Sequence, residues 1–150
     1  MEKSNPVIHF EMPSKDSARI AKFYKEAFGW DTKELGKAYG DYVLALTTDI
    51  DERGMPTEPG TINGGFFPVK ENMPAQTTLV VIRVADMNKA VRALGHAGGT
   101  LNVKPMEIPD IGMYASFYDT EGNHVGLLEL TLAMKEKVNR QPLVSHKDNP

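Results

Sequence analysis

A histidine and a glutamate, His9 and Glu11, stand two residues apart in the first apolar segment of the chain. Residues 7–12 are rich in apolar and β-branched types and are followed by Pro13, which predicts a short strand. Alternation along a strand places both side chains on one face. Such a pair could act as a general acid and base, or could anchor a polar ligand. The plainer alternative is that both groups are only hydrogen-bonded and partly solvated.

The elements that would position this pair follow from apolar periodicity. The first half predicts a helix over residues 16–28, with Ser14 as its cap and Asp16 near its positive end, and strands over 30–35, 42–47 and 61–69. The second half predicts a strand over 77–84, a helix over 87–97 capped by Asp86, and strands over 100–104, 113–118 and 124–131. Residues 119–123 (D-T-E-G-N) predict a turn.

The two halves repeat the same order of elements. A shift of 70 residues aligns Asp16 with Asp86 and Gly29 with Gly99, and a shift of 62 later aligns Gly64 with Gly126. Each half is therefore a βαβββ module, the first over about residues 6–69 and the second over about 77–131. The prediction is one α+β domain over residues 1–131. Residues 132–150 form a tail, read either as a further helical turn with a frayed end or as an arm that packs on a partner subunit.

Composition excludes several classes of function. The chain has 150 residues, no cysteine, and a formal charge of −3 from 17 basic and 20 acidic side chains. The absence of cysteine excludes a thiol nucleophile and cysteine-ligated metals. Without a basic run, a nucleic-acid partner is not expected, and without a long apolar run neither is a membrane partner. No apolar leader is visible at the start, so a cytoplasmic location is expected.

Three segments resemble the vicinal oxygen chelate superfamily, which contains glyoxalase I, bleomycin-resistance proteins and extradiol dioxygenases. They are V-I-H-F-E-M-P at residue 7, F-Y-K-E-A-F-G-W at residue 23, and Y-A-S-F-Y-D-T-E-G-N-H-V-G-L-L-E at residue 114. The resemblance covers about residues 7–130. It implies two βαβββ modules that form a curved mixed sheet around a cleft, commonly in a homodimer.

The resemblance also implies a divalent metal, held by a His or Gln on the first strand and a Glu on the last strand of each module. His9 matches the first position. Its equivalent in the second module is Leu79, and the two carboxylate positions fall on Gly64 and Gly126. Glu129 is predicted to face the other side of its strand. One matching ligand is too few for a catalytic ion, so no metal site and no cofactor are predicted, with a divalent metal kept as the alternative.

The remaining candidates would line the implied cleft. Glycine within a strand often marks a close approach, so Gly64 and Gly126 would clear space for a ligand, or would simply be bulges. Phe66 and Tyr114 would give the cleft aromatic walls, although core packing explains any one such residue more often than ligand contact does.

The sequence thus predicts a small-molecule-binding protein without the family's metal, and it does not decide whether the protein is an enzyme. The predicted ligand-binding residues are His9, Glu11, Gly64, Phe66, Tyr114 and Gly126. One alternative is a lyase, isomerase or dioxygenase-like enzyme with an atypical metal site or a His9–Glu11 acid–base pair. Another is an interaction module with a vestigial cleft.

Overall fold

The computed structural model describes residues 4–73 and 76–140 as one eight-stranded sheet with helices. In chain order the elements are β1 (Val7–Ser14), α1 (Ser17–Phe28), β2 (Asp31–Glu34), the 3-10 turn η1 (Lys37–Tyr39), β3 (Val43–Leu46), β4 (Asn63–Pro68), β5 (Leu79–Arg83), α2 (Met87–His96), β6 (Thr100–Ile108), β7 (Gly112–Tyr118), β8 (His124–Leu130) and α3 (Leu132–Asn139).

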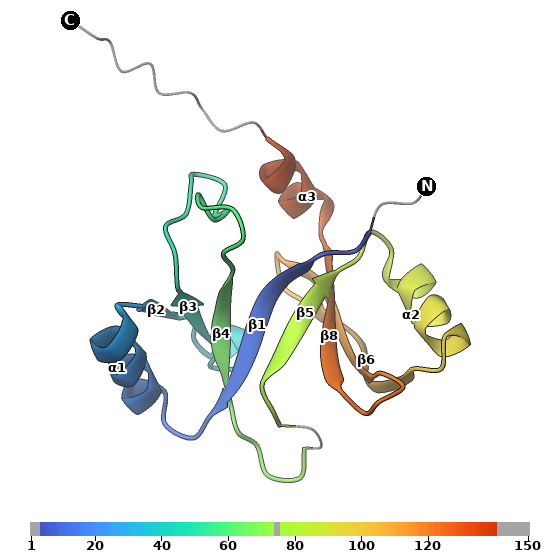
Figure 1. The fold of residues 1–150 in the computed structure, drawn as a ribbon, viewed down its shortest axis with the longest axis horizontal. Coiled ribbons are helices and arrows are strands. Elements are labelled where there is room, and N and C mark those ends of the chain that lie inside the picture. The colour runs from blue at the N-terminus through green and yellow to red at the C-terminus, as the bar shows by residue number, and fades with distance from the viewer. Residues whose placement is uncertain (1–3, 74–75, 141–150) are drawn as a thin grey trace, which may run out of the picture.

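The strand order is β2-β3-β4-β1-β5-β8-β7-β6, so each module contributes one half of a mixed, curved sheet. Within each half the first strand pairs in parallel with the last, β1 with β4 and β5 with β8. The halves join through the antiparallel pair of β1 and β5. In Figure 1, α1 and α2 lie at opposite outer sides of the sheet. The predicted α+β fold of paired βαβββ modules is confirmed.

Equivalent aspartates start the first two helices. The Asp16 carboxylate accepts a hydrogen bond from the Arg19 amide (2.9 Å), and the Asp86 carboxylate accepts one from the Lys89 amide (3.0 Å). Each bond satisfies an amide that the first helical turn leaves without a partner. The prediction that Ser14 caps α1 is wrong, because β1 runs on to Ser14 and Asp16 is the cap.

Each module has its own apolar core between its helix and the sheet. In the first module Val43, Ala45 and Phe66 are buried beneath α1, and the half-buried Phe10 on β1 packs against them. In the second, the core is built from Val84, Met87, Ala115 and Leu127. The face of the sheet opposite α1 and α2 is called the inner face below. Since Phe10 faces α1, alternation turns His9 and Glu11 to the inner face.

The chain after β8 forms α3, whose end is held by the long loop between β3 and β4. Arg53 in this loop donates hydrogen bonds to the carbonyl oxygens of Val138 (3.1 Å) and Arg140 (2.8 Å). The Asp51 carboxylate orients the Arg53 guanidinium at 2.7 Å. The predicted tail is helical as far as Asn139, and residues 141–150, where an arm was the alternative, lie outside the described residues. Across residues 4–73 and 76–140, no helix is long and apolar enough to span a membrane.

Candidate functional site

Four polar side chains meet on the inner face, where the two modules join. The Glu11 carboxylate accepts hydrogen bonds from the hydroxyls of Tyr42 and Tyr114, and Nε2 of His9 lies 2.7 Å from the Tyr42 hydroxyl. Tyr42 directly precedes β3, Tyr114 lies on β7, and the other two lie on β1. These four residues are called the tyrosine–glutamate cluster. The structure therefore brings together three of the predicted residues, His9, Glu11 and Tyr114, and adds Tyr42.

Burial dominates the electrostatics of this cluster. Burial raises the pKa of Glu11 above its ordinary value, against the opposing effect of the hydrogen bonds from Tyr114 and Tyr42. Burial lowers the pKa of His9 to about 4, so its ring is neutral at pH 7. The pKa of each tyrosine is raised, first by burial and then by the Glu11 charge. At neutral pH both phenols therefore keep their protons, and the cluster has no positively charged member.

A glycine beneath each tyrosine makes room for it. A Cβ on Gly65 would overlap the ring and hydroxyl of Tyr42, and a Cβ on Gly126 would lie 3.1 Å from the Tyr114 hydroxyl and from Val81. Gly65 pairs with Leu44 and Gly126 pairs with Ser116, and each tyrosine precedes that partner by two residues. Tyr42 and Tyr114 thus occupy equivalent positions in the two modules.

The prediction that Gly64 is the repeat partner of Gly126 is wrong by one residue. Glu11 pairs with Gly65, and a shift of 70 residues takes Glu11 to Val81, which pairs with Gly126. Gly65 is therefore the counterpart of Gly126. A slip of one residue along a strand exchanges the two faces of the sheet, so Gly64 belongs to the α1 side.

Gly64 and Phe66 consequently do not join the tyrosine–glutamate cluster. A Cβ on Gly64 would lie 2.5 Å from the ring of Phe10, on the side of α1. The Phe66 side chain is 1% exposed, and its ring stacks at 5.5 Å from that of Tyr24. Phe66 is a core residue, as the alternative interpretation of the sequence allowed.

A second polar group on the inner face escaped the sequence analysis. The Asn102 amide donates to the Ser116 hydroxyl (3.3 Å) and lies 3.2 Å from Nε2 of His124. The His124 ring lies 5.4 Å from that of Tyr118. A register shift in the pairing of β6 with β7 falls between Leu101 and Val103, which surround Asn102, and no sequence signal announced this irregularity.

A divalent metal of the kind implied by the resemblance does not fit these donors. Only His9 and Glu11 offer suitable atoms on the two central strands, because the equivalents in the second module are Leu79 and Val81. The Glu11 carboxylate is already hydrogen-bonded to two tyrosines. Glu129 faces away, as predicted, and accepts a hydrogen bond from the Met87 amide at the start of α2 (2.7 Å). Within the described part of the chain, no group of three or more acidic, histidine or cysteine side chains could hold a metal ion.

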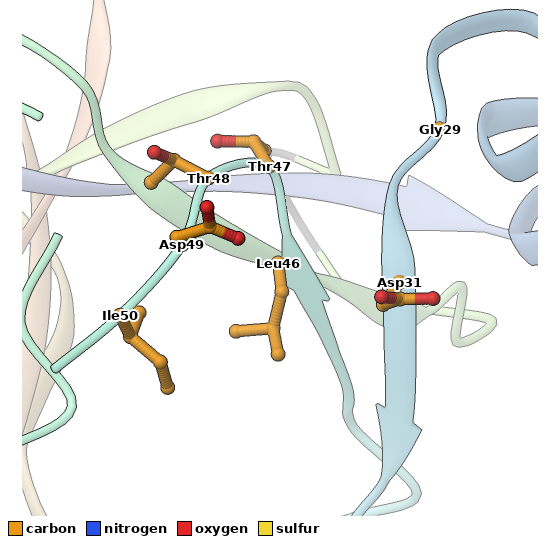
Figure 2. A pocket seen from close by; sticks show the side chains of 7 residues that line it. All are labelled: Gly29, Asp31, Leu46, Thr47, Thr48, Asp49 and Ile50. Atoms are coloured by element: carbon orange, nitrogen blue, oxygen red, sulfur yellow. The ribbon is translucent and has the colours of Figure 1, made fainter. Parts of the chain in front are cut away.

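A separate hollow of about 360 Å³ lies where β3 ends, and no member of the tyrosine–glutamate cluster lines it. Figure 2 shows the side chains that line this hollow. Thr47, Thr48 and Asp49 line it together with Leu46 and Ile50. The Thr47 hydroxyl already donates to the carbonyl oxygen of Ile62 (2.6 Å), and its amide donates to the Asn63 side chain (2.8 Å). These polar groups hold the corner between β3 and β4 in place.

Comparisons with known proteins agree with this architecture. A family model described as Glyoxalase/Bleomycin resistance protein/Dioxygenase superfamily matches residues 7–127. A glyoxylase-like domain-containing protein from Didymella fabae is 30% identical over 116 residues, which span 75% of this chain and 84% of that protein.

Two solved structures share the fold at low sequence identity. The methylmalonyl-CoA epimerase from Mycobacterium tuberculosis is 15% identical, with a TM-score of 0.61 over 91% of this chain and 97% of that one. A Streptomyces coelicolor methylmalonyl-CoA epimerase variant in complex with 2-nitronate-propionyl-CoA is 12% identical, with a TM-score of 0.60 over 85% of this chain and 96% of that one. The family match over residues 7–127, together with the 30% identical relative, shows that this chain belongs to the glyoxalase/bleomycin resistance protein/dioxygenase superfamily.

Proposed function

We propose that the protein binds a small organic ligand at the tyrosine–glutamate cluster, without the metal that the family resemblance implies. The observation that carries this proposal is the convergence of Tyr42 and Tyr114, one from each module, on the Glu11 carboxylate. A few convergent polar side chains are what fixes the orientation of a small ligand in most binding sites.

The fold itself does not require these polar groups. At the equivalent positions of the second module, Leu79 and Val81 are 5% and 2% exposed and pack as ordinary apolar side chains. Burying a carboxylate costs desolvation free energy unless hydrogen bonds offset that cost. In this protein the hydroxyls of two tyrosines are needed to provide those hydrogen bonds. A costly arrangement in one module, beside an apolar one in the other, supports a functional origin.

The test is a thermal-shift screen of small organic compounds on wild-type protein and on Glu11→Gln. Glu107→Gln, at an exposed position on β6, is the matched control. A binder at a hundredfold excess over its Kd should stabilise the wild type and Glu107→Gln by about 2.7 kcal/mol. Glu11→Gln should lose most of that shift. Binding that Glu11→Gln and Tyr114→Phe leave unchanged would place the ligand elsewhere and refute the proposal.

A second candidate function is proton transfer at a carbon next to a carbonyl group, as in an isomerase. The raised pKa of Glu11 favours it, because a general base works best when its pKa approaches the working pH. Glu11 would take the proton from carbon, and a tyrosine hydroxyl would stabilise the oxygen of the resulting enolate. The test is exchange of such hydrogens for deuterium in heavy water, followed by NMR. Exchange that Glu11→Gln abolishes supports this function, whereas equal exchange in both proteins contradicts it.

A homodimer and a cytoplasmic location complete the proposal. Light scattering on the purified full-length chain measures the first, and fractionation of the source cells measures the second. The same oligomeric state for the full-length chain and for a chain ending at Arg140 would argue against a role of residues 141–150 in assembly.

A further inference from the structure

A second hollow, of about 390 Å³, lies at the start of α1, where β1 passes into the helix (Figure 1). No member of the tyrosine–glutamate cluster lines it. Its volume is within the range of about 300–1,000 Å³ that small-molecule sites occupy. The lining of this hollow includes Ser14, Lys15, Asp16, Arg19, Ile20 and Phe23.

The charged side chains of this hollow are mainly positive. Lys15 and Arg19 are exposed, and neither side chain forms an ion pair or a hydrogen bond with the described residues. By contrast Lys22, which lies on the same helix outside the hollow, pairs with Glu26 at 3.8 Å. Asp16 is the one acidic residue in the lining, and its carboxylate already accepts the hydrogen bond from the Arg19 amide. The hollow therefore offers two cations to an anionic group from outside the chain.

Part of the lining is apolar and open to solvent. Phe23 is 56% exposed, and its ring meets that of Tyr24 edge-on at 5.0 Å. Ile20, one turn earlier, packs partly against the core of the first module. A ligand ring that covers Phe23 removes apolar surface from water, which favours binding.

The second module has small, uncharged side chains at two of the equivalent positions. A shift of 70 residues takes Lys15 to Ala85 and Phe23 to Ala93. A βαβββ module of this chain therefore folds without a cation and an aromatic ring at the start of its helix. The fold alone does not explain why the first module has both.

Ser14 adds a polar group that the core does not use. Its hydroxyl oxygen is buried and has no hydrogen-bond partner in the part of the chain that the structure describes. The equivalent residue of the second module is Val84, which is 4% exposed and packs in the core. A buried hydroxyl without a partner costs stability, so packing alone would favour valine here as well. A change of rotamer can turn the serine hydroxyl toward a ligand in the hollow.

We propose that this hollow binds a small aromatic acid, whose carboxylate is held by Lys15 and Arg19 and whose ring packs on Phe23. The site is separate from the tyrosine–glutamate cluster and does not rest on the proposed function. A guanidinium presents a planar pair of N–H donors that fits both oxygens of a carboxylate, and hydrogen bonds between charged partners are the stronger kind. The Ser14 hydroxyl can donate to the same carboxylate. A protonated amine would meet two like charges, and an alcohol would keep the ring contact without the charge.

The experiment uses three ligands that differ only in the head group: 3-phenylpropanoate, 3-phenylpropan-1-ol and 3-phenylpropan-1-amine. Each is titrated into the labelled full-length protein at pH 7, and the backbone amides are followed by NMR. The acid should shift the amide signals of Lys15, Arg19 and Phe23 and should bind about tenfold more tightly than the alcohol, with the amine weakest. An amine that binds as tightly as the acid would overturn the inference, and so would an acid that leaves these amide signals unchanged.

Two pairs of variants test the two halves of the site. Arg19→Gln removes a cation but keeps the backbone amide that binds the helix cap, so it should weaken the acid about tenfold and leave the alcohol unchanged. Its matched control, Lys22→Gln, removes a cation of the same helix outside the hollow and should leave the affinity for the acid unchanged. Phe23→Ala should weaken acid and alcohol by the same factor, whereas Phe28→Ala, at a 67% exposed position outside the hollow, should weaken neither. Equal losses of acid affinity in Arg19→Gln and Lys22→Gln would contradict the inference, and so would an unchanged affinity in Phe23→Ala.

Glu11→Gln separates this site from the tyrosine–glutamate cluster. The hollow and the cluster share no residue, so this variant should leave the affinity for the acid unchanged. Binding of the acid that is lost in Glu11→Gln and kept in Arg19→Gln would place the ligand at the cluster. That outcome would overturn the present inference and support the proposed function.

Discussion

The two modules share one backbone plan and differ in what they place at the centre of the inner face. The first supplies His9 and Glu11 on β1, whereas the second supplies Leu79 and Val81 at the equivalent positions on β5. Both supply a tyrosine that lies over a glycine. Repetition thus accounts for the paired tyrosines, and departure from repetition accounts for the charge between them. Chemistry at this site depends on the asymmetry.

Making the second module resemble the first should have the largest effect. Val81→Glu would put a second carboxylate at a position that is 2% exposed, next to Tyr114 and paired with His9 across the two central strands. An uncompensated buried charge costs about 3–5 kcal/mol, so the variant should lose most of its stability to urea. The reverse exchange, Glu11→Val, should leave stability at pH 7 equal or higher. A Val81→Glu protein as stable as wild type would show that water reaches the centre of the inner face and solvates the new carboxylate.

His9 should give the next largest effect, through pH. Its pKa is about 4 in the folded protein and 6.5 in the unfolded chain, so between these values the unfolded chain binds more protons. Stability is complete above pH 6.5 and falls with the pH, by up to about 3 kcal/mol near pH 4.

Glu11 acts in the opposite direction, because its raised pKa makes the folded state bind the extra proton above pH 4.5. The loss due to His9 should therefore be measured by urea unfolding in a Glu11→Gln background. Adding His9→Leu, the residue type of the second module, should flatten the profile. An unchanged slope would show that another group is responsible.

The two glycines should differ in their tolerance of a methyl group. Gly65→Ala overlaps Tyr42 and should cost about 1–3 kcal/mol, whereas Gly126→Ala meets neighbours at 3.1 Å and should cost less. Tyr42→Ala added to Gly65→Ala should recover part of the loss, because it removes the overlapping ring. If the two alanine variants have equal melting temperatures, Tyr42 does not lie over Gly65 in solution.

Removal of either helix cap should cause the smallest loss of stability, and the two losses should be nearly equal. Asp16→Ala and Asp86→Ala each remove one hydrogen bond to the first turn and should each cost about 1 kcal/mol. Urea titrations of the two variants should give similar midpoints. A difference of more than about 1 kcal/mol would mean that one of these caps has a further role in its module.

Most of the fold could be predicted because its signals are local and repeated. Asp86 as a helix cap and the D-T-E-G-N turn act over a few residues, and both are confirmed. The strand register carries no such local signal. Because Gly64 and Gly65 are adjacent, alignment of the halves could not choose between them, and the choice of Gly64 turned Gly64 and Phe66 to the wrong face for the cluster.

The candidate site was predictable where it lies on one strand. Alternation on β1 sufficed to place His9 and Glu11 together. Tyr42 belongs to no motif and reaches Glu11 only through the pairing of β3 with β4 and of β4 with β1. Its one signal, the equivalence to Tyr114, becomes visible only when the correct glycines are aligned. Groups that tertiary structure alone brings together are the part that single-sequence reasoning misses.

The contact between Arg53 and the end of α3 has a consequence for the order of folding. Its two hydrogen bonds join residues 85 and 87 positions apart, from one module to the segment that follows the other. Such distant contacts form late, because closure of a long loop costs entropy before any contact repays it. Each βαβββ module can assemble from shorter loops, but α3 can dock on Arg53 only after β4 and β8 are in place. Docking of α3 is therefore a late event, and protection of its amides would mark the molecules in which both modules have already closed.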